Sequence, residues 1–133
     1  MHEGTPLELA LYRLDKAKEK LSAAIVMKEN GMYADAINRS YYAIFHTMRA
    51  LLALEMKDFK KHSGVISYFQ QNYIKTKIFD IKYSEIVTSA FDIRNDSDYE
   101  DFFIISKEDV EMQIANAVLF IEAVEKYINK FKN

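Results

Sequence analysis

The chain has 133 residues, a formal net charge of −2, 50% hydrophobic residues and 29% charged residues. This composition is typical of a globular chain, excludes a disordered one, and fits a single domain over residues 1–133. Because the net charge is slightly negative, binding of duplex nucleic acid over a broad basic surface is excluded. Any nucleic acid is expected to be met locally, in a cleft.

The residue types that are rare or absent exclude further classes of protein and of functional site. Cysteine is absent, so disulfides, thiolate metal sites and cysteine nucleophiles are excluded. The chain has only one proline and three glycines, too few turn-forming residues for the many tight turns of a β fold. This scarcity favours long helices. No uncharged apolar run is long enough to span a membrane, so we expect no membrane span. Because Glu3 and Glu8 precede any apolar run, we also expect no secretory leader and a cytoplasmic location.

The first two predicted helices form a pair. The first begins after Thr5, which can cap it, with Pro6 at the first helical position, and Gly31 is expected to end it in a left-handed cap. The second follows after a residue or two, at about 33–55. So short a connection predicts an antiparallel hairpin of two helices.

Three more helices are predicted along the rest of the chain. Ser63 is expected to cap the third, the fourth covers about 84–94, residues 95–105 form a long connection, and Ser106 caps the last. The last helix carries an apolar seam, made of Val110, Ile114, Ala117, Ile121, Val124 and Ile128. Apolar residues also lie off this seam, namely Met112, Leu119 and Phe120, and they favour an oligomer. The pattern as a whole predicts an all-α fold.

The second helix has two unlike faces. One is apolar, formed by Ile37, Tyr41, Ile44, Phe45, Met48 and Leu52. On the other, Arg39, Tyr42, His46 and Arg49 recur at steps of three and four. These four side chains can line a cleft and meet a phosphate, or they can form the amphipathic rim of a buried helix.

Several kinds of site are not supported by the sequence. No glycine-rich phosphate loop, dinucleotide fingerprint or nucleophile elbow occurs. The three histidines, His2, His46 and His62, lack the i,i+4 pairing of a helical zinc site, so no metal and no cofactor is expected. His62 is interpreted as a helix-start residue beside Ser63. Arg94, followed by several acids, remains as a candidate beyond the second helix.

Four sequence runs together resemble the HEPN domain, the higher eukaryote and prokaryote nucleotide-binding family. They are GMYADA at 31–36, YYAIFH at 41–46, KHSGV at 61–65 and RNDSDY at 94–99. The likeness extends from about residue 9 to 127 and is greatest to the small stand-alone prokaryotic branch. It implies an up-and-down bundle of four main helices plus a short extra one, paired as a dimer through the second helix and the end of the fourth.

The resemblance also implies two activities. Many members are metal-independent ribonucleases, in which an arginine holds the scissile phosphate. A histidine that follows after four to six intervening residues assists attack by the 2′-hydroxyl. Others are partners of minimal nucleotidyltransferases in toxin–antitoxin modules, and in some of these a tyrosine is adenylylated. Arg94 matches the family arginine, but Tyr99 stands where the histidine would begin, and no histidine follows.

Three functional hypotheses follow. The first is a component of a toxin–antitoxin-like module that binds RNA, a nucleotide or a nucleotidyltransferase partner, with Tyr99 as a modification candidate. Its binding residues would be Arg39, Tyr42, Arg49, Arg94 and Tyr99. The second is a divergent ribonuclease in which His46 replaces the missing histidine beside Arg94. The third is a purely structural helical dimer.

Overall fold

A computed structural model describes residues 4–132; His2 lies outside the described residues. Every regular element in this range is helical, as the sequence predicted. The elements are α1 (Pro6–Glu29), α2 (Tyr33–Leu54), α3 (His62–Phe69), the π-helical turn η1 (Gln70–Ile74), α4 (Ile81–Tyr99) and α5 (Lys107–Asn129). Four long helices and the short α3 make up the predicted bundle.

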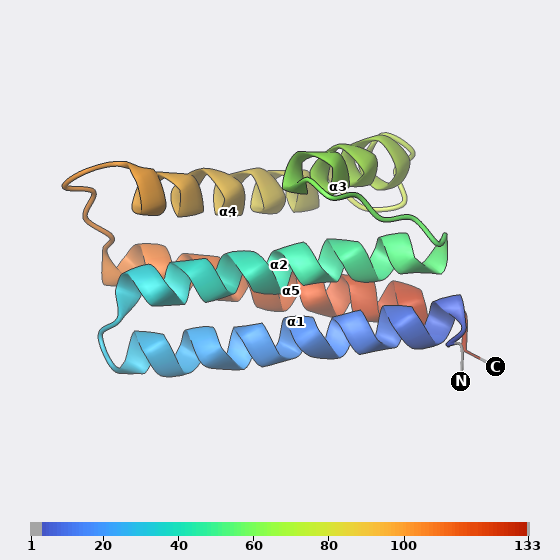
Figure 1. Cartoon of the computed structure of the whole chain (residues 1–133), viewed down its shortest axis with the longest axis horizontal. Coiled ribbons are helices and arrows are strands. Elements are labelled where there is room, and N and C mark those ends of the chain that lie inside the picture. The colour runs from blue at the N-terminus through green and yellow to red at the C-terminus, as the bar shows by residue number, and fades with distance from the viewer. Residues whose placement is uncertain (1–3, 133) are drawn as a thin grey trace.

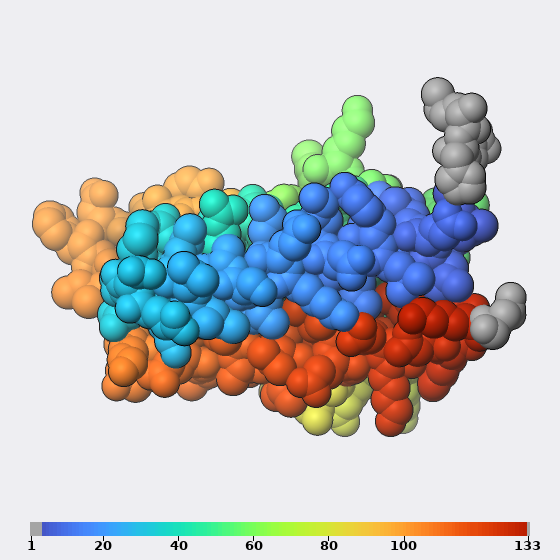
Figure 2. Space-filling view, turned by 90° about the horizontal axis from the view of Figure 1, so that it is seen from below, coloured from blue at the N-terminus to red at the C-terminus, as the bar shows by residue number. Residues whose placement is uncertain are grey.

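The long helices run along one common axis (Figure 1). Helices α1 and α2 are an antiparallel hairpin, as predicted, and α5 lies beside both of them. Figure 2, seen from below, shows α1 and α5 side by side along this face. Helix α4 lies on the other side of α2, with α3 and η1 beside it at one end. The connection between α4 and α5 is at the end of the bundle opposite the chain termini.

Helix ends that depend on local chemistry were predicted correctly. The Thr5 Oγ1 atom accepts a hydrogen bond from the Glu8 backbone N–H at 3.0 Å. Gly31 has φ 73°, the left-handed geometry that ends α1 and that glycine adopts without steric cost. Ser106 and Asp109 form a reciprocal capping box at the start of α5.

Three predicted helix boundaries were wrong, namely the start of α3 and both ends of α4. Helix α3 begins at His62, and its N-cap is Lys61 without a side-chain hydrogen bond, so Ser63 lies inside the helix. Helix α4 is longer than predicted at both ends, because Asp80 caps it and an i,i+4 ion pair between Arg94 and Asp98 supports an extra turn. Residues 95–99, expected in the connection, are therefore helical.

Helix α2 occupies the centre of the bundle. All six residues of its predicted apolar face are buried, and so are its small residues Ala36, Ala43 and Ala50. The predicted seam of α5 is buried except for Ile114, which is half-buried. Phe120 is also fully buried, where it packs edge-on against Phe69, so it does not offer a free face to another copy. Met112 and Leu119 remain exposed.

The helices are too polar or too short to cross a bilayer. No helix in the part of the chain that the structure describes has the length and apolar character that a transmembrane helix requires.

Candidate functional site

Arg94 lies on α4 over the aromatic side chains of α2. Its guanidinium carbon is 5.1 Å from the ring centre of Tyr41 and 5.7 Å from that of Tyr42. These distances are typical of cation–π contacts. The fold therefore brings the arginine of the fourth helix onto the second helix, 52 residues earlier in the chain.

The outer nitrogens of Arg94 have only long polar contacts. Nη2 donates to the Tyr42 hydroxyl at 3.4 Å, and Nη1 to the Asn95 side-chain oxygen at 3.4 Å. Nε lies 3.1 Å from Asp98 Oδ2, close enough for an ion pair, but it lacks the alignment of a hydrogen bond. An incoming phosphate can therefore compete well for the two Nη atoms, which form the fork that fits phosphate oxygens.

His62, at the start of α3, joins this cluster. Its Nδ1 is 2.7 Å from the Tyr41 hydroxyl, and its ring lies 4.0 Å from that of Phe45, measured between centres. Burial raises the pKa of Tyr41 to about 12, against the opposing charge of Arg94, so the phenol stays protonated at neutral pH. Burial, followed by the charges of Arg94 and Arg49, lowers the pKa of His62. Its imidazole is therefore neutral at neutral pH.

His46 lies on the side of α2 that faces α1. Its ring is 6.2 Å from that of Tyr42. Burial, followed by the positive charges of Arg49, Lys20, Arg13 and Lys16, lowers the pKa of His46 to about 4. Tyr42 is placed between the two sequence-predicted catalytic residues, with its hydroxyl toward Arg94 and its ring toward His46.

The other predicted site residues are more dispersed. Arg49 lies one turn beyond Phe45 on α2 and is paired with Asp58 at 2.8 Å. Arg39 is half-buried about one turn before Tyr42. Tyr99, at the end of α4, is 75% exposed. The structure thus brings Arg94 of α4 to Tyr42 of α2, and it places Arg49 about two turns beyond Tyr42 on α2.

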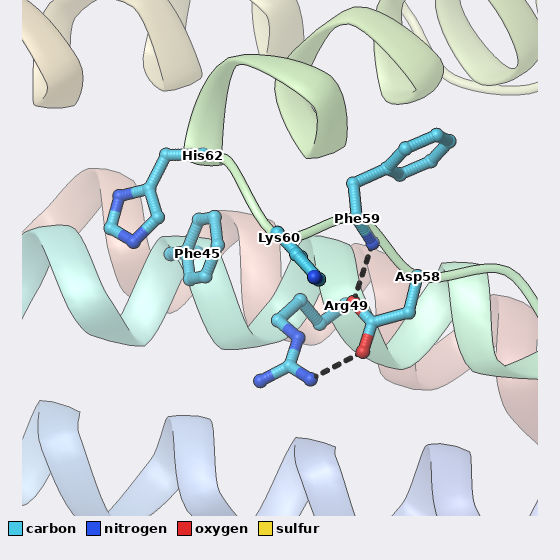
Figure 3. A pocket seen from close by; sticks show the side chains of 6 residues that line it. All are labelled: Phe45, Arg49, Asp58, Phe59, Lys60 and His62. Carbon is cyan, nitrogen blue, oxygen red and sulfur yellow. Dashed lines mark hydrogen bonds and ion pairs between the residues drawn. The ribbon is translucent and has the colours of Figure 1, made fainter.

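A hollow of about 430 Å³ opens beside His62, between α2 and the segment that leads into α3. It is lined by Phe45, Arg49, Asp58, Phe59, Lys60 and His62. Figure 3 shows the His62 ring at one end and the Arg49–Asp58 pair at the other, with the Phe59 ring turned away toward α3. Three of its lining residues are cationic or can become so, which suits an anionic ligand.

No metal is suggested by this arrangement. Within residues 4–132, no group of three or more histidine and acidic side chains is arranged to hold a metal ion. The chemistry that the cluster offers is phosphate binding by a guanidinium and proton transfer by a neutral imidazole.

Comparison with known proteins identifies the family. The HEPN domain model matches residues 10–127, which is most of the chain. The chain belongs to the HEPN family. This result confirms the resemblance drawn from the four sequence runs.

Several similar proteins are of nearly the same length. "Putative toxin MJ0605" of Methanocaldococcus jannaschii is 34% identical over 117 residues, covering 88% of this chain and 87% of that protein. "Putative toxin MJ0142" of the same organism is 31% identical over 115 residues, covering 86% and 78%. A "UPF0332 protein" of Thermotoga maritima is 32% identical over 117 residues, covering 88% and 89%.

Sequence reasoning did not place His62 in the candidate site of this HEPN protein. Its neighbours Tyr41 and Phe45 are 21 and 17 positions away, so only the tertiary fold brings them together. One indication was available, because His62 belongs to the KHSGV run that carried part of the family resemblance.

Proposed function

We propose that this HEPN protein is a component of a toxin–antitoxin-like module and binds a phosphate group of RNA or a nucleotide at Arg94. The observation that carries the proposal is the position of Arg94, whose guanidinium lies over the rings of Tyr41 and Tyr42 while its Nη atoms have only long polar contacts. Tyr41 also contacts His62. The names of the two Methanocaldococcus relatives support the toxin-like role.

Each residue has a distinct role in this proposal. Arg94 holds the phosphate, Tyr42 stacks on a base, and Arg39 and Arg49 add positive charge along α2. Tyr42 is half-buried and packs edge-on against Tyr41 at 5.2 Å, which keeps its ring in a fixed orientation. A pre-oriented ring loses little entropy on binding a base.

Binding of a fluorescent single-stranded RNA, measured by anisotropy at fixed salt, tests the proposal. We expect Arg94→Ala to weaken binding about tenfold or more, and Arg94→Lys to recover only part of it, because lysine lacks the planar fork. Lys130→Ala is the matched control, since Lys130 also lies over a tyrosine ring, that of Tyr127. Equal losses in Arg94→Ala and Lys130→Ala would refute a specific role for Arg94.

A second candidate function is metal-independent RNA cleavage, favoured by a neutral histidine near Arg94. In the tautomer whose Nδ1–H donates to Tyr41, the Nε2 lone pair of His62 is free to accept the 2′-hydroxyl proton. The 2′-oxygen then bonds to phosphorus while the bond from phosphorus to the 5′-oxygen breaks. The 5′-oxygen takes a proton from water, and a 2′,3′-cyclic phosphate forms. His46 is the alternative base predicted from the sequence.

Cleavage in the presence of a chelator separates these possibilities. If His62 is the base, His62→Ala abolishes formation of the cyclic phosphate and His46→Ala does not; the reverse pattern assigns the role to His46. Equal background cleavage in wild type and Arg94→Ala would end the ribonuclease candidate and leave binding alone.

Tyr99 is the proposed target of a minimal nucleotidyltransferase partner. Its exposed phenol can attack the α-phosphorus of ATP, with loss of its proton and release of pyrophosphate, to give an O-adenylyl tyrosine. Mass spectrometry after co-expression with a nucleotidyltransferase encoded beside this gene should find one adenylyl group, absent in Tyr99→Phe. Tyr12, also exposed at 59%, offers the control Tyr12→Phe, which should leave the modification unchanged.

Self-association is the last part of the proposal. Exposed apolar side chains gather after α4, where Phe102 is 99% and Ile104 is 87% exposed. Burial of such residues stabilises an interface between two copies. Sedimentation should report a dimer or higher oligomer that Phe102→Asp weakens; a monomer at all concentrations would contradict this part.

A further inference from the structure

Asp58, in the segment between α2 and α3, bridges two arginines from different helices. Its Oδ2 atom lies 2.8 Å from Arg49 Nη2 and 3.3 Å from Arg13 Nη2. Arg13 Nη1 also donates to the Arg49 backbone carbonyl at 3.2 Å, which fixes the spacing of the two side chains. A single carboxylate oxygen therefore lies where two guanidinium groups converge, a position that a phosphate oxygen can also occupy.

The local charge at this cluster is not balanced by one carboxylate. Burial lowers the pKa of Arg13, and the nearby charge of Arg49 lowers it further, while Asp58 opposes both effects. Lys60 and Lys57 line the hollows on either side of Asp58 and add two more positive charges. Because two arginines and two lysines surround one acid, an anion that carries more than one negative charge suits this place better than Asp58 does.

There is space beside the pair for a ligand. Asp58 lines both the hollow of about 430 Å³ that contains Arg49 and a second one of about 190 Å³ that contains Arg13. Movement of the Asp58 side chain would expose both guanidinium groups to a single ligand. Figure 3 shows the Lys60 side chain extending toward the Arg49–Asp58 pair.

The arginines and the carboxylate differ in how firmly they are held. Arg13 and Arg49 project from the long helices α1 and α2, and their side chains are only 14% and 27% exposed. Asp58 lies outside the helices, and its side chain is 46% exposed. Its other oxygen, Oδ1, accepts from the backbone N–H of the adjacent Phe59 at 2.9 Å. The carboxylate is thus the part of the cluster that can move most easily.

We propose that Arg13 and Arg49 form a binding site for a phosphate group, which Asp58 occupies until the ligand displaces it. The ligand class is a phosphate monoester or a terminal phosphate, because its dianion replaces the single charge of Asp58. This site shares Arg49 with the function proposed above but does not use Arg94, so the effect of Arg94→Ala on each kind of binding tells the two proposals apart.

Titration of the full chain with inorganic phosphate, followed by calorimetry at constant ionic strength, tests the site. Asp58→Asn keeps the shape of the side chain and removes its charge, so it should bind phosphate about tenfold more tightly than the wild type. Adding Arg49→Gln to this variant should abolish the gain, and adding Arg94→Ala should not. Asp35→Asn is the matched control, because Asp35 lies in the first turn of α2, about 20 Å from Arg49 along the helix, and its substitution changes the net charge equally.

Two results would overturn the proposal. One is equal phosphate affinity in Asp58→Asn and Asp35→Asn, and the other is a gain that persists without the Arg49 guanidinium. If Asp58→Asn does not fold, Asp58→Ser takes its place in the same design. In the wild type, phosphate should also shift the Nε resonances of Arg13 and Arg49; unchanged resonances at saturating phosphate would count against the site.

Discussion

The Tyr41 hydroxyl and the His62 imidazole are joined by a 2.7 Å contact that fixes the start of α3 on α2. The same tyrosine ring lies under the Arg94 guanidinium, so one residue positions both the proposed phosphate-binding group and the nearby imidazole. Tyr41 is itself only 1% exposed, which leaves its ring little freedom to move. The site therefore depends on a core residue of the bundle.

Tyr41→Phe should disturb this arrangement without removing the ring. It deletes the hydroxyl partner of His62, and we expect a loss of about 1 kcal/mol in the free energy of unfolding, because a part-buried imidazole nitrogen loses its hydrogen bond. Urea unfolding measures the change. Tyr42→Phe is the control, since its hydroxyl makes only a 3.4 Å contact, and its loss should be smaller. A larger loss in Tyr42→Phe would contradict the role given to Tyr41.

The low pKa of His46 predicts a pH dependence of stability. With a folded pKa of about 4 against an ordinary value of 6.5, the unfolded chain binds the proton first as the pH falls. The contribution of His46 to stability is therefore fully present above pH 6.5 and is lost between pH 6.5 and 4. Because the ring is only half-buried, solvent screening reduces the loss from the full value for this shift to on the order of 2 kcal/mol.

Proton NMR of the His46 ring gives the most direct check of that value. Its titration midpoint should lie near pH 4, and urea unfolding of His46→Gln should lose less stability than the wild type between pH 6.5 and 4. A midpoint close to 6.5 would mean that burial and the cations of α1 do not act on this ring as described.

Gly64→Ala should displace the segment that carries Asp58. A Cβ at this position would lie 2.9 Å from the Phe59 Cβ atom, closer than real contacts allow, and that atom is held near the backbone. We expect a loss of about 1–3 kcal/mol in the free energy of unfolding. Gly4→Ala is the control, because its nearest neighbour would be at 3.4 Å, and it should be close to neutral. No difference between the two variants would contradict the packing of Phe59 on α3.

Asp98→Asn should strengthen RNA binding at Arg94. Asp98 is the carboxylate 3.1 Å from Arg94 Nε, and it opposes an approaching phosphate. The expected gain is a few-fold in affinity, since a partly exposed ion pair contributes about 1 kcal/mol or less. Asp96→Asn removes the same charge from an exposed position on α4 and controls for the overall field. Equal gains in both variants would show that only net charge matters.

Much of the fold could be predicted because its determinants are local. Thr5, Gly31 and Ser106 act within one helical turn, and the apolar faces of α2 and α5 are visible as regular spacing. The end of α4 was mispredicted because the acids after Arg94 were interpreted as a loop, whereas Asp98 pairs back along the helix.

The site was less predictable because it depends on contacts between distant segments. Spacing identified Tyr42 as a site candidate, and the HEPN resemblance identified Arg94, but neither gave the orientation of their side chains. The position of His62 over Phe45 depends on how α3 begins, and the Arg13–Asp58 contact joins residues 45 positions apart. No local pattern encodes such contacts.

A crystal structure of the protein with a short single-stranded RNA tests the central claim most directly. We predict a phosphate within hydrogen-bond distance of the Arg94 Nη atoms, with a base against Tyr42 and the His62 ring beside the same nucleotide. RNA bound elsewhere on the protein, with Arg94 still directed to Asp98 and Tyr42 and no phosphate in contact with it, would contradict the account.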